Sequence, residues 1–274
     1  MLKRVFNLIE FACAILYSVV LRFTRKRPAR VVLYYHGVSR VFAEDFRRQM
    51  AYLARECRVV KPCDIVSMTT EGNRTIVAVT FDDAFVSVLE NALPVLREYG
   101  LPAGISVPTG NIGRRPDWPM APDCPDKDDI VMNEPQIAAL DREGFEILSH
   151  TVSHPALTDL NEAELEVELT KSRQDLEHIV GHDVSAICYP YGAYDARVHS
   201  ATRKAGYTLG FTIDPGIVDG TADCLRIGRF VVSPRDNLTA FRLKANGAYQ
   251  VVRPLRSLKR MLVRSGKAYS EKPI

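Results

Sequence analysis

The sequence lacks paired cysteines, internal repeats and any motif for nucleic-acid binding. Its six cysteines are scattered over 274 residues, and none forms a C-x-x-C pair. This pattern favours a reducing compartment over a disulfide scaffold, although it does not exclude one or two bridges. With 46% apolar and 25% charged residues, the composition is not that of a disordered chain. The length suits one large domain with a full core, or two small domains.

A strong overall charge is also missing, because the formal net charge is only +3. The basic residues nevertheless gather near the two ends of the chain: Arg22, Arg25, Lys26, Arg27 and Arg30 on one side, and Arg253, Arg256, Lys259, Arg260 and Arg264 on the other. Such clusters can bind nucleic acid or an anionic membrane surface. Because no nucleic-acid motif lies between them, we expect no nucleic-acid partner and favour a membrane surface or simple solubility.

An uninterrupted apolar run that could cross a bilayer is absent near the N-terminus. Residues 5–23 are mostly apolar but contain Glu10, and a membrane span needs roughly 20 apolar residues. No small-residue cleavage site follows, so we do not expect a cleaved signal peptide. Apolar residues recur at helical spacing, namely Phe6, Ile9, Cys13, Leu16, Val20 and Phe23. This spacing favours a helix that lies in the membrane interface or docks on the protein.

These features predict three regions: an apolar helix and basic linker at 1–29, a main domain at 30–250, and a basic tail at 251–274. If the first region crossed a membrane, the basic residues behind it would place the main domain in the cytoplasm. We therefore expect a cytoplasmic protein, either unattached or held on the inner face of the membrane, with anchoring outside as the alternative. The oligomeric state does not follow from the sequence.

Strand-like and helix-like segments alternate from residue 30 onward. We expect strands at 30–35, 75–80, 103–107, 145–148, 186–189, 207–213 and 225–232. We expect helices at 43–56, 85–99 (kinked at Pro94), 134–142, 161–180, 196–205 and 238–245. This alternation predicts a parallel sheet. It fits a (β/α) barrel better than a two-layer fold, and a doubly wound sheet remains the alternative. Residues 108–133 form a long loop of the kind that often covers a site.

Acidic and imidazole side chains follow two of the expected strands. Asp82 and Asp83 come directly after the strand at 75–80, and His150 and His154 follow the strand at 145–148. Ligands gather at the carboxyl ends of parallel strands. An Asp pair or an H-x-x-x-H spacing alone is weak, since solvated turns and surface histidines share these patterns. Together they indicate one divalent metal and one spare carboxylate, the equipment of a metal-assisted hydrolase.

Three segments in this order resemble the first motifs of the polysaccharide deacetylase (NodB-homology) family: Thr80-Phe81-Asp82-Asp83, Ser149-His150-x-x-x-His154-Pro155, and Tyr189-Pro190-Tyr191-Gly192. The resemblance covers about residues 30–232. It implies a distorted (β/α)7 barrel that hydrolyses an N-acetyl, or another N- or O-acyl, group on a sugar. It also implies a glycan or amino-sugar substrate in envelope or exopolysaccharide assembly.

The resemblance also implies roles for individual residues. Asp83, His150 and His154 would hold one divalent metal, and Asp82 would be the general base. Zinc is expected first, with cobalt, nickel or iron as alternatives, because imidazole and carboxylate ligands suit several divalent ions. Tyr191 would line the position of the acyl oxygen.

The chain departs from the family pattern at three places. Ala84 stands where the family often has Gly, Cys188 and Tyr189 occupy the region of an Arg that orients the base, and no histidine follows His199 to serve as the general acid. His36, at the end of the first strand, is a candidate to replace that acid, with a hydrogen-bonded turn histidine as the alternative. Trp118, alone in the long loop, is a candidate for stacking on a sugar ring, with a loop anchor as the alternative. A non-catalytic carbohydrate-binding protein on the same scaffold is the competing function.

Overall fold

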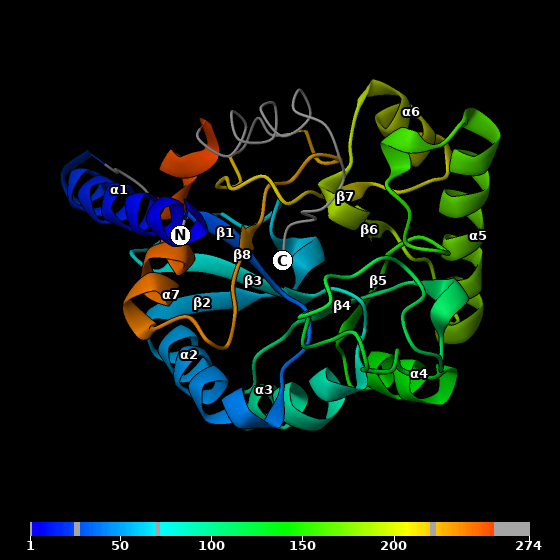
Figure 1. Ribbon diagram of the computed structural model, residues 1–274, viewed down its shortest axis with the longest axis horizontal. Coiled ribbons are helices and arrows are strands. Elements are labelled where there is room, and N and C mark those ends of the chain that lie inside the picture. Colours follow the sequence, from blue (N-terminus) through cyan, green and yellow to red (C-terminus); the bar gives the residue numbers. More distant parts are fainter. Residues whose placement is uncertain (1, 25–27, 70–71, 220–222, 255–274) are drawn as a thin grey trace.

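Eight parallel strands form one curled sheet in the part of the chain that the computed structural model describes, residues 2–24, 28–69, 72–219 and 223–254 (Figure 1). The strands are β1 (Arg30–Tyr35), β2 (Cys57–Val60), β3 (Thr75–Phe81), β4 (Gly104–Val107), β5 (Glu146–Ser149), β6 (Ala186–Cys188), β7 (Leu209–Phe211) and β8 (Phe230–Val231). Their order is β7-β6-β5-β4-β3-β1-β8, and β2 pairs with the first half of β3.

Seven α-helices are present in the same described part of the chain. They are α1 (Leu2–Thr24), α2 (Ala43–Glu56), α3 (Leu93–Tyr99), α4 (Glu134–Arg142), α5 (Glu162–Val180), α6 (Ala196–Lys204) and α7 (Leu238–Ala245). Helices α2 to α6 lie around the outside of the sheet in Figure 1. The α/β class and the parallel sheet are therefore confirmed.

The segment that includes Ile227 and β8 pairs with both β7 and β1, so the sheet nearly closes into a ring. Ile227 pairs with β7, because its N–H donates to Gly210 O and its carbonyl accepts from Thr212 N, both at 2.8 Å. Three residues later, Phe230 pairs with Leu33 of β1. One short segment thus pairs with both β7 and β1, which confirms a distorted, barrel-like sheet.

Strands β1 and β3 position the residues that follow their carboxyl ends. They pair in parallel over six residues, from Arg30 opposite Ile76 to Tyr35 opposite Phe81. All six residues of β1 are buried, as expected for a parallel strand covered on both faces. The rings of Tyr35 and Phe81 stack with centroids 5.4 Å apart. The residues that follow the two strands therefore leave the sheet side by side.

Two elements differ from the expectation, whereas the helix expected at 85–99 is present. Residues 86–99 are helical without a break, and Val88–Ala92 form a π-helical turn directly before Pro94, so the helix departs from regular α geometry at the proline. The strand expected at 225–232 is reduced to Phe230–Val231. Strand β2 was not predicted, because it follows α2 without an intervening turn.

Helix α1 docks on the C-terminal part of the described chain. Ala14 is fully buried, and the Tyr17 hydroxyl accepts a hydrogen bond of 2.7 Å from the side-chain amide of Gln250 in the short 3-10 helix Ala248–Val252. No described helix has both the length and the apolar character that a bilayer span requires. Arg30, counted above in the N-terminal basic cluster, is instead buried and donates to Val218 O. Arg25, Lys26, Arg27 and residues 255–274 lie outside the described residues.

Candidate active site

The site lies at the carboxyl ends of neighbouring parallel strands. Asp82 follows β3, and its N–H donates to Tyr35 O at 2.9 Å, which continues the pairing of β3 with β1. His150 follows β5, and its N–H donates to Val107 O at 2.9 Å, which continues the pairing with β4. Because both residues extend the sheet's own hydrogen bonds, the strand register places their side chains on one rim.

Strained backbone is concentrated in the same segments. In the described part of the chain, the non-glycine residues with positive φ are Asp83 (70°), Ala84 (49°), Thr151 (68°), His154 (57°) and Tyr191 (57°). A left-handed conformation costs a non-glycine residue roughly 1–2 kcal/mol. All five residues belong to, or directly follow, the three motifs noted in the sequence. The fold therefore bears this cost where side chains must be aimed into the site.

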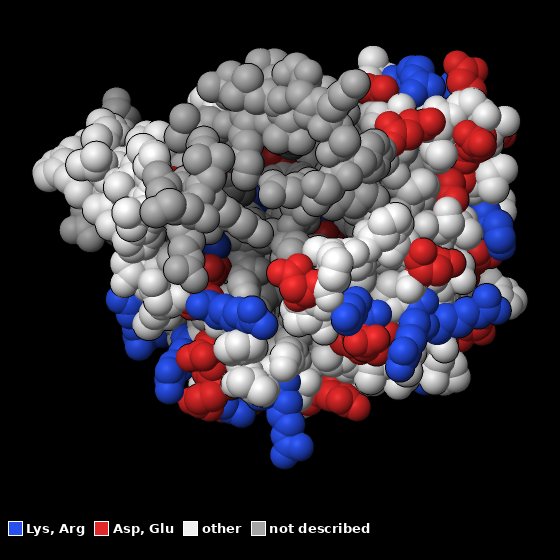
Figure 2. Space-filling model, in the orientation of Figure 1, with Lys and Arg blue, Asp and Glu red and all other residues white. Residues whose placement is uncertain are grey.

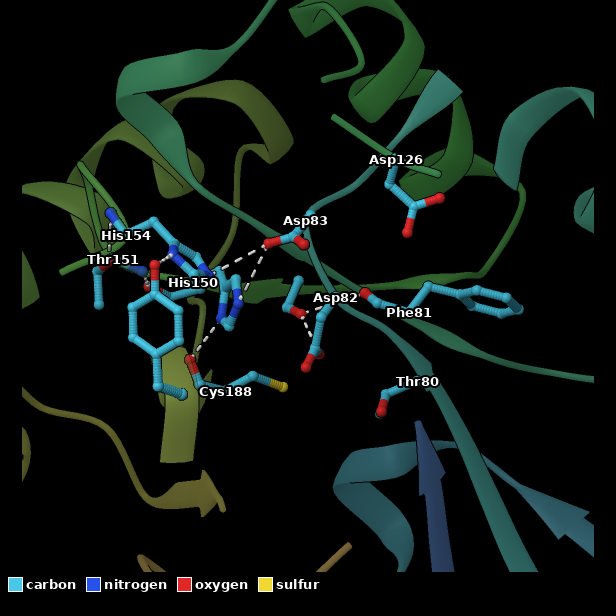
Figure 3. A network of polar contacts seen from close by, with 12 residues as sticks. Thr80, Phe81, Asp82, Asp83, Asp126, His150, Thr151, His154 and Cys188 are labelled. Atoms are coloured by element: carbon cyan, nitrogen blue, oxygen red, sulfur yellow. Dashed lines mark hydrogen bonds and ion pairs between the residues drawn. The ribbon is translucent and has the colours of Figure 1, made fainter. Parts of the chain in front are cut away.

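One carboxylate and two imidazoles face a common space (Figure 3). Asp83 Oδ1 is 3.5 Å from His150 Nε2 and 3.4 Å from His154 Nε2. The three ligand atoms lie within 4.8 Å of one another, and all three residues are buried. Among the described residues, Asp83 Oδ1 is a buried polar atom with no hydrogen-bond partner. Burial without a partner is costly for such an atom, and a cation between the three residues would satisfy it.

Both histidines are oriented by contacts on their second ring nitrogen. Nδ1 of His150 is 2.7 Å from the Cys188 carbonyl oxygen. Since a carbonyl can only accept, Nδ1 carries the hydrogen, and the lone pair of Nε2 points toward Asp83. Burial lowers the pKa of His150 to about 4, so the ring is neutral at neutral pH. His154 Nδ1 contacts the Tyr191 hydroxyl at 3.1 Å. Such outer contacts are typical of metal-binding histidines.

The charge of Asp83 is poorly compensated. Burial, followed by repulsion from Asp82 and Asp126, raises its pKa well above the ordinary value. A bound divalent cation would reverse this balance by favouring the carboxylate. Two neutral imidazoles and one carboxylate form a donor set that suits zinc, cobalt, nickel or iron. The residues present therefore fit a divalent metal.

Asp82 has different neighbours, although it is next in sequence. Arg229 donates two parallel hydrogen bonds to it, from Nη1 to Oδ1 at 2.7 Å and from Nη2 to Oδ2 at 2.8 Å. The Ser106 hydroxyl donates to Oδ1 at 2.8 Å. Burial alone would raise the pKa of Asp82, but the Arg229 charge, helped by His150, lowers it overall. Asp82 is therefore a fixed, ionised carboxylate beside the three candidate ligands.

Arg229 is the site residue that the sequence did not reveal. Its side chain is fully buried, lies over the Tyr34 ring at 4.4 Å, and donates from Nε to Thr212 O at 3.1 Å. Its Nη1 is 3.3 Å from Cys188 Sγ. Cys188 occupies the region where the family carries its own orienting Arg, so a guanidinium from the segment just before β8 lies beside that position. The available signal was an Arg directly before an apolar run, Phe230-Val231-Val232.

The remaining predicted residues line the same small cavity of about 100 Å³. The predicted site residues around it are His36, Asp82, Asp83, Trp118, His150, His154 and Tyr191. Trp118 is only 7% exposed; its ring stacks on His154 with centroids 4.4 Å apart and also lies against Phe85. Trp118 thus anchors its loop on a candidate metal ligand. Its contact with a sugar stays a prediction.

Asp126, from the long loop at 108–133, also lines this cavity. The Gly37 N–H donates to its Oδ2 at 3.4 Å, next to His36. A Cβ added to Gly37 would lie 2.3 Å from Asp126 Oδ1, so glycine is what permits this close approach. Burial raises the pKa of Asp126, while the neighbouring His36 opposes that rise. Asp126 therefore joins the long loop to the strand end that carries His36.

Comparisons with known proteins agree with this geometry. The family whose sequence profile matches residues 69–210 is described as polysaccharide deacetylase. The Bacillus subtilis protein YxkH is 27% identical over 234 residues, which cover 82% of this chain and 77% of that protein. A poly-beta-1,6-N-acetyl-D-glucosamine N-deacetylase of Staphylococcus epidermidis is 25% identical over 202 residues, which cover 69% of this chain and 67% of that protein. The solved Streptococcus pyogenes deacetylase PplD, in complex with acetate, shares the fold with a TM-score of 0.66 at 20% identity and covers 81% of this chain and 99% of that one.

Proposed function

The chain belongs to the polysaccharide deacetylase family, and from that premise we propose that it is a metal-dependent hydrolase removing an acetyl group from an amino sugar of a polysaccharide or glycan precursor. One observation carries the proposal. Asp83, His150 and His154 face one another with an unpaired carboxylate oxygen, while the adjacent Asp82 is held apart by Arg229. This arrangement separates metal binding from proton transfer.

Zinc is the cation that we propose, with cobalt, nickel and iron as alternatives for the same donors. Held by Asp83, His150 and His154, a divalent cation supplies Lewis-acid chemistry: it lowers the pKa of a water to about 7 and polarises an acyl carbonyl. Asp82 then accepts the proton of the attacking water. Arg229 keeps the Asp82 carboxylate ionised and oriented. Oδ1 accepts from both Arg229 and Ser106, whereas Oδ2 accepts from Arg229 and keeps a lone pair for that proton.

The leaving amine needs a proton donor, and His36 is our candidate. It lies at the end of β1, lines the cavity together with Asp82 and Asp83, and is followed by the Gly37 contact with Asp126. The backbone N–H of Tyr191 is our candidate for a contact with the acyl oxygen, as the family resemblance implies. The cavity of about 100 Å³ is small compared with the 300–1,000 Å³ of pockets for drug-sized ligands. This size favours a short acyl group such as acetyl.

The Staphylococcus epidermidis relative suggests which glycan to test first, because its name specifies a β-1,6-linked N-acetylglucosamine polymer. The purified chain, loaded in turn with zinc, cobalt, nickel or iron, is incubated with oligomers of that sugar. We expect release of acetate together with an equal amount of free amine. Asp82→Asn should abolish release while the metal stays bound, and His150→Ala should lose the metal. Sugar binding without acetate release under every metal would instead support the non-catalytic alternative.

The role of His36 can be separated from that of Asp82 by the choice of leaving group. We expect His36→Gln to slow release of acetate from an N-acetyl sugar by about 10²-fold or more, because the amine leaves poorly without a proton. Hydrolysis of 4-nitrophenyl acetate should remain within a fewfold of the unmodified chain, since nitrophenolate leaves unprotonated. Asp82→Asn should slow both reactions. Equal losses on both substrates in His36→Gln would refute its role as the general acid.

A further inference from the structure

Helix α1 carries an apolar stripe that faces away from the protein. Seven large apolar side chains on it are exposed, including Leu8 (69%), Leu16 (70%) and Phe23 (86%). The full set is Leu8, Ile9, Ile15, Leu16, Val19, Val20 and Phe23. Their spacing follows one face of a helix over about four turns. They are seven of the ten exposed large hydrophobic residues identified in the described part of the chain, so the exposure is concentrated in one place.

The orientation of this stripe is fixed, because α1 docks through another face. Ala14 is fully buried, Phe11 packs against the core, and Tyr17 is hydrogen-bonded to Gln250. The predicted stripe residues Ile9, Leu16, Val20 and Phe23 consequently point outward. Helix α1 lies at the edge of the molecule in Figure 1, and the described atoms at that place are mostly white in Figure 2.

The charge along the sequence indicates what covers the stripe. Residues 1–29 carry net +5 and residues 253–274 net +6, so a chain of net charge +3 leaves −8 for residues 30–252. Basic residues stand on both sides of the stripe in the sequence, with Lys3 and Arg4 before it and Arg25, Lys26 and Arg27 after it. An apolar helical face flanked by basic residues matches the interface of an anionic bilayer. The acidic main domain would be repelled by the same surface.

We propose that the outward face of α1 is a membrane-contacting surface that seats the protein on anionic lipid, with the helix lying in the plane of the interface. The apolar side chains enter the boundary between headgroups and acyl chains, and the positive charge of residues 1–29 adds attraction to the anionic headgroups. The net negative charge of residues 30–252 turns that part of the chain away from the lipid. This surface is independent of the catalytic residues, so the acetate-release experiments above neither support nor weaken it.

The test uses the full chain and vesicle flotation. We expect binding to vesicles of phosphatidylglycerol and phosphatidylcholine, and at least tenfold weaker binding to phosphatidylcholine alone. Raising the salt from about 0.1 M to about 0.5 M should weaken the binding severalfold, because it screens the headgroup attraction. The double variant Leu16→Glu, Phe23→Glu should lose at least tenfold in binding. The matched control is Val167→Glu on α5, where an apolar residue 58% exposed is changed and binding should not alter.

Circular dichroism and thermal unfolding of each variant confirm that the chain is folded, and the milder Leu16→Gln, Phe23→Gln pair gives a second reading if the charged pair is unstable. Three results would overturn the proposal. The full chain could fail to bind anionic vesicles, the α1 variants could bind as the unmodified chain does, or light scattering could show a dimer that Leu16→Glu converts to a monomer without any vesicle binding. The last result would assign the face to a second copy of this chain.

Discussion

Asp82 and Asp83 are adjacent in sequence but have opposite electrostatic surroundings. Asp82 receives two hydrogen bonds from Arg229, whereas Asp83 Oδ1 has no hydrogen-bond partner among the described residues. Consequently the pKa of Asp82 is lowered, and that of Asp83 is raised by burial and by Asp82 itself. A cation is therefore more stabilising next to Asp83 than next to Asp82. This difference is the physical basis for assigning one carboxylate to the metal and the other to proton transfer.

We predict that Arg229 positions the base Asp82, and that an arginine introduced at position 188 can take over this role. Arg229→Lys keeps the charge but loses the paired geometry, so kcat should fall by about 10–100-fold with metal content unchanged. Arg229→Ala leaves the buried Asp82 unpaired and should destabilise the fold by about 3–5 kcal/mol. Adding Cys188→Arg to Arg229→Ala should restore at least tenfold in kcat, because Cys188 Sγ lies 3.3 Å from Arg229 Nη1.

The control for this prediction is Cys188→Ala, which removes the thiol without adding a guanidinium. It should leave kcat within a fewfold of the unmodified chain. Full turnover in Arg229→Ala, measured at saturating substrate, would exclude the positioning role. Loss of metal from Arg229→Lys would show that the arginine acts on the metal site instead.

The buried neutral ring of His150 should make the metal-free fold sensitive to acid. Its pKa in the folded chain is about 4, below an unfolded value near 6.5, so the fold favours the neutral form. This contribution is complete above pH 6.5 and is lost as the pH falls toward 4, by about 3 kcal/mol. Urea unfolding at several pH values should show the loss in the chelated chain. His150→Gln should lack this component, and identical pH slopes for the two chains would contradict the assignment.

At the scale of elements, the turn after β3 combines two left-handed residues with a buried carboxylate. Ala84 has φ +49° where the family often carries glycine. We predict that Ala84→Gly raises the free energy of unfolding by about 0.5–1 kcal/mol, because the relief of strain exceeds the added unfolded-state entropy. The control is Ala78→Gly within β3, buried in extended backbone, which should destabilise by about 1 kcal/mol. A loss of stability in Ala84→Gly would show that the turn is not strained.

Elements with a clear start and stop could be predicted from the sequence. The helices at 43–56, 134–142 and 238–245 have the predicted bounds. Helix α5 begins after Asn161, whose side chain forms a capping box with that of Glu164. The last strand was overestimated because its apolar pattern runs through Gly228, where a Cβ would meet the Asp214 carbonyl at 2.5 Å. Strand β2 was missed because Cys57 both ends α2 and begins the strand.

The sequence could predict those site residues that lie close together along the chain. The Asp82-Asp83 and His150-x-x-x-His154 spacings are local, and parallel pairing brings the strand ends to one rim. Arg229 contacts Asp82 across 147 residues, a pairing that no local spacing can reveal. The Asp126 contact with Gly37 spans 89 residues and depends on how the long loop folds. Long-range polar pairs, rather than motifs, were what the sequence could not specify.

At the scale of the whole molecule, the curled sheet gathers residues from both ends of the chain. His36 follows the first strand and lines the cavity. Arg229 comes from just before the last strand, and it reaches Asp82 because the segment 227–231 pairs with both β7 and β1. The same arrangement leaves α1 docked outside the sheet on the C-terminal 3-10 helix. The candidate catalytic residues and the candidate membrane-contacting face of α1 thus lie in separate parts of one fold.

The proposed reaction depends on a single divalent cation shared by Asp83, His150 and His154, with Asp82 outside its coordination sphere. Anomalous diffraction from crystals of the cobalt-loaded chain measures this directly. We predict one peak per chain, about 2.0–2.2 Å from Nε2 of both histidines and from an Asp83 oxygen, while both Asp82 oxygens stay on Arg229. A peak coordinated by Asp82, or one located away from these three residues, would contradict this assignment of the metal ligands.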